Sequence, residues 1–92
     1  MSVYRRAVNR WGVSAQLWMV VEECAELILA VARMMRGRAD KRAVITEIAD
    51  VRIMTEQLRV MLDVTPEELD AEIARKLERL GARLDAAEVT RG

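Results

Sequence analysis

The chain has 92 residues, of which 52% are apolar but only 3% aromatic, so its core must be aliphatic, as in helical bundles. Its 15 basic and 15 acidic residues cancel, which removes the general electrostatic case for binding nucleic acid or an anionic membrane. Histidine is absent, which excludes His-ligated zinc and any mechanism with an imidazole base, so catalysis would depend on carboxylates and a metal ion.

The N-terminus and the single cysteine bear on where the protein works. The first residues lack the apolar core of a signal peptide, and the longest uncharged run, from Gly12 to Val21, is too short to span a bilayer. Cys24 has no partner for an intrachain disulfide, so nothing indicates an oxidising compartment. We expect a soluble cytoplasmic protein that binds neither membrane nor nucleic acid.

Glycine residues divide the first half of the chain into two expected helices. The first covers about residues 3–11 and ends near Gly12. Ser14 is the expected N-cap of a long second helix that runs to about residue 36. Gly37 then provides a left-handed stop.

Two further helices are expected in the second half of the chain. Asp40 is the expected cap of the third helix, which reaches about residue 63. The run Thr65-Pro66-Glu67-Glu68 is a capping box with proline at the first helical position, and it opens a last helix toward residue 84. Residues 85–92 are expected to fray.

The second helix is apolar over most of its circumference, and its acids occupy one narrow sector. That sector holds Glu22, Glu23 and Glu26. Apolar residues that recur at spacings of four and three predict a core seam on this helix. The members of this seam are Leu17, Val21, Cys24, Ile28, Val31 and Met35.

The third helix places two acids where its core face should be. Its apolar stripe consists of Val44, Val51, Met54, Leu58 and Met61. Glu47 and Asp50 fall within this stripe or at its edge, whereas Glu56 is expected on the solvated face. Because burying an ionised carboxylate without a partner costs several kcal/mol, acids on inward faces require a compensating cation.

Magnesium is the cation that fits such acids, because it takes oxygen ligands and commonly binds a few carboxylates, waters and phosphates. Glu23 and Glu26 are three residues apart, as are Glu47 and Asp50, so two antiparallel helices would form a four-carboxylate pocket. Glu22 can join the edge of this pocket as a ligand, as a partner of a ligand or as the acceptor of a water proton.

The pattern Glu22-Glu23-x-x-Glu26, twenty residues, then Glu47-x-x-Asp50 resembles the EExxE and ExxD signature of the MazG-like members of the all-α NTP pyrophosphohydrolase superfamily. The resemblance covers about residues 9–84 and extends to the segments Trp11-Gly12-Val13-Ser14-Ala15-Gln16-Leu17, Ile48-Ala49-Asp50-Val51 and Lys76-Leu77-Glu78-Arg79-Leu80. It implies that residues 1–92 form one MazG-like all-helical domain, a short helical bundle completed by oligomerisation into a dimer or tetramer.

The resemblance also implies an activity. A nucleoside triphosphate would be hydrolysed between its α- and β-phosphates to the monophosphate and pyrophosphate, for example to cleanse the nucleotide pool. Glu23, Glu26, Glu47 and Asp50 would hold Mg²⁺, with Mn²⁺ as a substitute, and these four together with Glu22 would be the catalytic set. A related interpretation keeps this chemistry but takes phosphoribosyl-ATP as the substrate.

Several other residues have two interpretations. Trp18 either stacks on the nucleobase or lies in an interface core. Lys76, Arg79 and Arg83 either approach the phosphates, as basic residues of this region do in the resembling proteins, or pair with nearby acids on the surface. The basic run around Arg36 and Arg38 either attracts the triphosphate or keeps a turn solvated.

An alternative of a different class is also open. The chain would then be a non-catalytic helical oligomerisation module whose acids decorate its surface. Only the inward placement of Glu47 and Asp50 separates this interpretation from the enzymatic one.

Overall fold

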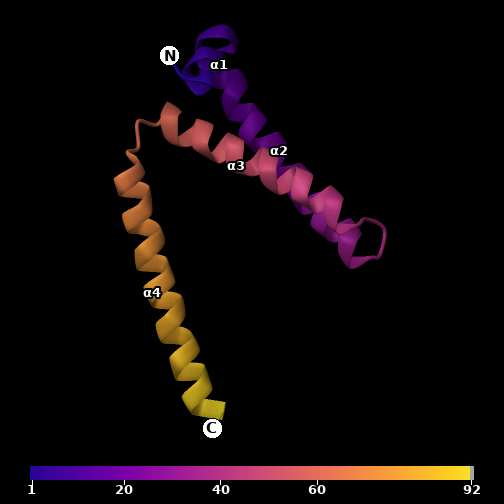
Figure 1. Ribbon diagram of the computed structural model, residues 1–92, viewed down its shortest axis with the longest axis vertical. Helices are drawn as coiled ribbons and strands as arrows, with labels where there is room; N and C mark the ends of the chain where they lie inside the picture. The colour runs from indigo at the N-terminus through magenta and orange to yellow at the C-terminus, as the bar shows by residue number, and fades with distance from the viewer. Residues whose placement is uncertain (92) are drawn as a thin grey trace.

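The computed structural model describes residues 1–91, which form four helices joined by turns (Figure 1). They are α1 (Val3–Trp11), α2 (Val13–Met35), α3 (Lys41–Met61) and α4 (Pro66–Arg91). The expectation of an all-α fold is confirmed for these residues. Among them, no helix combines the length and the apolarity that crossing a bilayer requires.

Side-chain caps begin two of the helices where the sequence predicts them. The Asp40 carboxylate accepts a hydrogen bond from the Ala43 amide at 3.0 Å. The Thr65 hydroxyl accepts from the Glu68 amide at 3.1 Å, and the Glu68 carboxylate accepts from the Thr65 amide at 3.2 Å. This reciprocal pair is the predicted capping box, and it fixes the start of α4.

Two boundary predictions are wrong. Ser14 is not a cap, because α2 already begins at Val13 and Gly12, with a φ of +90°, turns the chain directly from α1 into α2. The Gly12 amide still donates to Val8 of α1, while its carbonyl accepts from Gln16 of α2. Residues 85–91 do not fray but continue α4, because neither glycine nor proline interrupts this stretch and Ala86 and Ala87 favour helix; residue 92 lies outside the described residues.

Helices α2 and α3 pack side by side as a hairpin, and the stripe predicted for α3 is confirmed. Met54 is buried, and the other members of the α3 stripe are half-buried. The seam predicted for α2 is wrong, because the face that packs on α3 is displaced from it by one residue. Two members of the predicted seam, Ile28 and Met35, are 70% and 80% exposed. The packed face of α2 consists of Gln16, Val20, Glu23, Leu27 and Ala30.

The shift arises because α2 is apolar on several sides, so its periodicity alone does not select the face that meets α3. Ala30 is small enough for close helix packing, and Gln16 meets an amide on α3. The packed face therefore carries Glu23 into the hairpin seam.

A buried amide joins the first three helices. Gln57 of α3 is only 2% exposed, and its Nε2 donates to the Tyr4 carbonyl of α1 and to Oε1 of Gln16 on α2, both at 3.0 Å. Its own Oε1 is buried and accepts no hydrogen bond from the described residues. The network fixes α1 across one end of the hairpin.

Helix α4 stands apart from the rest of the described chain and packs against none of the other three helices (Figure 1). The turn before it is anchored, because Arg59 donates to the Val64 carbonyl at 2.6 Å and Arg5 pairs with Asp63 at 3.1 Å. The radius of gyration is 17.3 Å, whereas a compact chain of this length has about 12 Å. The single chain therefore does not close around its own apolar surface.

Candidate metal centre

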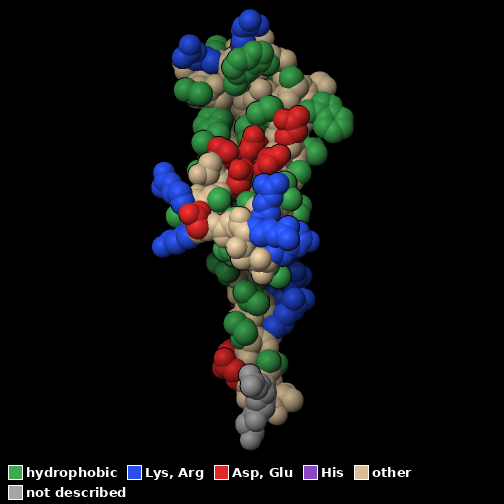
Figure 2. Space-filling view, turned by 90° about the vertical axis from the view of Figure 1, so that its right-hand side faces the viewer, with side chains coloured by type: hydrophobic (Ala, Val, Ile, Leu, Met, Phe, Trp, Pro, Cys, Tyr) green, Lys and Arg blue, Asp and Glu red, His purple; other side chains and the backbone are tan. Residues whose placement is uncertain are grey.

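Three of the five predicted carboxylates converge on one face of the α2–α3 hairpin. One carboxylate oxygen from each of Glu23, Glu47 and Asp50 lies within 4.8 Å of the other two. Glu23 comes from the packed face of α2, and the other two lie one helical turn apart on α3. All three are half-exposed, so a ligand can reach them. Figure 2 shows acidic side chains gathered in one patch with hydrophobic side chains around it.

The surroundings of Glu23 disfavour its charged form. Partial burial raises the pKa of Glu23, and the nearby charges of Asp50, Glu47 and Glu26, in that order, raise it further, as does a hydrogen bond that Glu23 shares with Asp50. A divalent cation bound between these carboxylates would offset their mutual repulsion, and the cluster offers oxygen ligands only, which suits a hard ion such as Mg²⁺.

The other two predicted acids lie beside this cluster but are not part of it. Glu26 is exposed, one turn along α2 from Glu23, and is close enough to influence its pKa. Glu22 is exposed on the same side of α2 and has no such influence on Glu23. The predicted four-carboxylate pocket is thus a group of three acids with Glu26 at its margin.

The predicted substrate-binding residues are not assembled around the cluster within one chain. Trp18 lies on α2 one turn before Glu22 and is 65% exposed. Lys76, Arg79 and Arg83 are exposed on α4, which contacts neither helix of the hairpin. Lys76 instead lies 3.9 Å from Glu72. Any role of these three cations at the carboxylates would require a second copy of the chain or a movement of α4.

Exposed cations also surround the turn between α2 and α3. They are Arg33, Arg36, Arg38, Lys41 and Arg42. Basic side chains lie directly beside the acidic patch in the space-filling view (Figure 2). An anion that reaches the carboxylates through a bound cation would therefore approach a surface of favourable charge.

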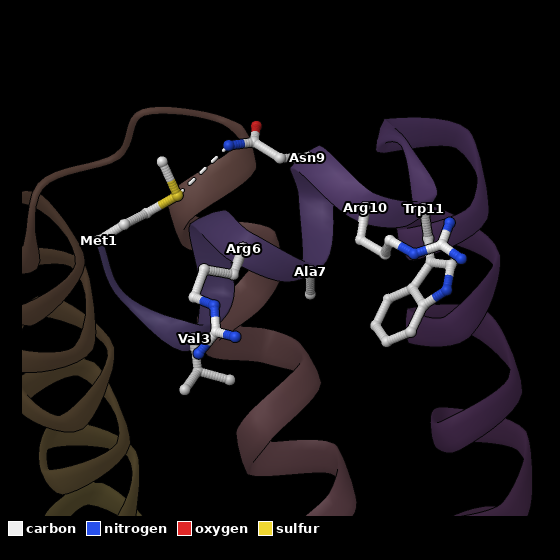
Figure 3. A pocket seen from close by; sticks show the side chains of 7 residues that line it. All are labelled: Met1, Val3, Arg6, Ala7, Asn9, Arg10 and Trp11. Carbon is white, nitrogen blue, oxygen red and sulfur yellow. Dashed lines mark hydrogen bonds between the residues drawn. The ribbon is translucent and has the colours of Figure 1, made fainter.

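A separate groove lies on the outer surface of α1, away from the acids (Figure 3). It is lined by the apolar residues Val3, Ala7 and Trp11 and by the cations Arg6 and Arg10. No acidic side chain lines it, so it cannot hold a metal ion through carboxylates. The acidic cluster is more relevant to function, because three converging carboxylates have a specific chemistry.

The amide pair of Gln16 and Gln57 was not predicted, although the sequence contains a signal for it. Gln16 precedes Glu23 by seven residues, and Gln57 follows Asp50 by seven. Seven residues are two helical turns, so in an antiparallel hairpin in which Glu23 meets Asp50, the two glutamines must also meet. The hairpin seam therefore has two polar layers, one of amides and one of acids.

Comparison of the chain with protein-family models, with curated proteins and with solved structures finds no match.

Proposed function

We propose that the protein is a magnesium-dependent, MazG-like nucleoside triphosphate pyrophosphohydrolase that acts as a homo-oligomer. The observation that carries the proposal is the convergence of Glu23, Glu47 and Asp50 from two helices. The same three positions belong to the EExxE and ExxD pattern, so the motif and the geometry agree.

The placement of these acids supports a functional role over surface decoration. Carboxylates on a solvated helix face repel one another little and are common without an ion. Here Glu23 occupies the packed face of α2, and its pKa is raised by burial and by its acidic neighbours. Keeping three acids in such a position costs stability, which a binding site for a cation explains.

Each acid has a role in the proposed reaction. Glu23, Glu47 and Asp50 would hold Mg²⁺, with Glu26 on the next turn of α2 as a further carboxylate beside them. Bound Mg²⁺ supplies neutralisation of the triphosphate charge and a lower pKa for water. Glu22, which is exposed beside the cluster, accepts the proton of the attacking water. The water oxygen bonds to the α-phosphorus, and the bond from that phosphorus to the bridging oxygen breaks, so that pyrophosphate leaves.

The test is product analysis with a panel of nucleoside triphosphates, including oxidised nucleotides and phosphoribosyl-ATP. We expect pyrophosphate and a monophosphate in equal amounts, in reactions that need Mg²⁺ or Mn²⁺ and stop with chelator. Release of inorganic phosphate and a diphosphate would contradict cleavage at the α-β bond. If no compound in the panel yields pyrophosphate, the chain is instead a helical oligomerisation module.

A further inference from the structure

Helix α4 carries an apolar stripe that no other helix of the described residues covers. Its members are Leu69, Ile73, Leu77, Leu80 and Leu84, which are between 40% and 62% exposed. Their spacings of four, four, three and four residues place them on one face of the helix. A stripe of this kind is typical of a helix that packs along another helix.

Helix α2 carries a second stripe with the same spacing. Val13, Leu17, Val21, Cys24 and Ile28 follow one another at intervals of four, four, three and four residues. Cys24 is half-buried, and the other four are between 40% and 70% exposed. This stripe lies next to the face that packs on α3, so it remains available after the hairpin has formed.

The exposed area is large enough for a stable interface. The chain exposes 7436 Å², whereas a folded monomer of 10.5 kDa exposes about 5,400 Å². The excess of roughly 2,000 Å² per chain corresponds to an obligate dimer, whose interfaces bury about 2,000–5,000 Å² in total. The net charge of zero means that no overall repulsion opposes association of two copies.

Helix α4 does not contact its own α2, and the turn at its start is held to α1 by Arg5 and to α3 by Arg59. Arg5 of α1 pairs with Asp63, and Ser2 and Arg5 line the same hollow as Thr65 and Pro66. Helices α2 and α4 therefore start at the same end of the molecule and diverge from it (Figure 1).

We propose that a second copy of this chain covers both stripes, with α4 of each copy packed parallel along α2 of the other. In each copy, α2 and α4 start at the same end of the molecule. A twofold axis near that end places α4 of each copy along α2 of the other copy, with the two helices running in the same direction. The equal spacing then sets the register, with Leu17 beside Ile73, Val21 beside Leu77, and Cys24 beside Leu80 of the second copy. Pairing of α4 with α4 would leave the α2 stripe exposed.

This inference depends on the proposed homo-oligomer but not on hydrolysis. Cross-linking and sedimentation report on the interface, and pyrophosphate release reports on the acidic cluster, so failure of one is distinguishable from failure of the other.

The native Cys24 provides the test. We expect wild type to sediment as a dimer or as a multiple of it, and Leu80→Cys to form a disulfide-linked dimer with Cys24 of the second copy under mild oxidation. The matched control, Leu80→Cys with Cys24→Ser, should remain unlinked. A linked dimer in that control would show α4 against α4 and overturn the proposal, as would a wild type that sediments as a monomer.

A second pair of variants tests the direction of packing in the Cys24→Ser background. Ile28→Cys with Leu84→Cys should cross-link if the helices are parallel, and Val13→Cys with Leu84→Cys, which faces the two positions in the reversed order, should not. The reverse result would indicate antiparallel packing and overturn the proposed arrangement. The replaced side chains of Ile28, Val13 and Leu84 are 70%, 49% and 52% exposed, so helicity measured by circular dichroism should match that of wild type.

Discussion

Asp50→Asn should stabilise the protein without metal and weaken its response to Mg²⁺. Asp50 lies within 4.8 Å of both Glu23 and Glu47. At that separation two like charges repel by about 0.9 kcal/mol in a water-like dielectric and by roughly 3.5 kcal/mol at an effective dielectric constant of 20. Because all three acids are half-exposed, the lower value applies better, and removing two repulsions should stabilise the metal-free fold by about 1–2 kcal/mol.

Thermal melts followed by circular dichroism at pH 7, with chelator and with Mg²⁺, measure both effects. Wild type should gain about 2.7 kcal/mol when Mg²⁺ is present at a hundred times its dissociation constant. The variant should melt above wild type in chelator, because it lacks the repulsion, but should gain less from Mg²⁺, because an amide is a weaker ligand than a carboxylate. Equal gains in the two proteins would refute the assignment of Asp50 as a metal ligand.

The raised pKa of Glu23 adds a pH dependence to the same experiment. Between its ordinary pKa and its raised value, the folded state keeps a proton that the unfolded state has released. Stability in chelator should therefore fall as the pH rises through this window. Asp50→Asn removes one cause of the raised pKa and should flatten this pH dependence.

Three further predictions concern the scaffold. Gln57→Leu leaves the Tyr4 carbonyl without its donor and should cost about 2 kcal/mol in urea unfolding, with α1 the first helix to exchange amide hydrogens. Glu56→Gln removes the carboxylate that holds Arg59. The hydrogen bond with Arg59 is the chief cause of the lowered pKa of Glu56. The stabilisation that this pair provides should therefore be lost in wild type as the pH falls through the lowered pKa. Thr65→Ala removes the capping box and should cost about 1 kcal/mol in a thermal melt; an unchanged melt would show that α4 does not need its cap.

The sequence predicted the helices and the α3 stripe because their signals are local. Capping residues and a single apolar face determine these features, as at Asp40, Thr65 and Met54. It did not predict which face of α2 meets α3, because Ile28 and Leu27 are equally apolar and only the partner helix distinguishes them. The orientation of α4 depends on tertiary contacts such as that of Arg5 with Asp63, which no periodicity reveals.

The candidate site was predicted in part. Spacing of three residues correctly brought Glu47 and Asp50 together, and their position in the α3 stripe directed them toward α2. Glu56 is half-exposed, in keeping with the solvated position expected for it, but it also holds Arg59 against the turn before α4. Glu56 is therefore a poor control for the acidic cluster. Glu78, which is exposed on α4 opposite its apolar stripe, is a better one.

The most direct test of the proposed function is pyrophosphate release by Glu47→Gln and by the matched control Glu78→Gln, measured with Mg²⁺ on the best substrate of the panel. Both substitutions replace a carboxylate by an amide of the same shape, but only Glu47 belongs to the converging cluster. The proposal predicts that Glu47→Gln lowers turnover by at least about tenfold, while Glu78→Gln keeps the wild-type rate. Wild-type turnover in Glu47→Gln, or equal losses in both variants, would contradict it.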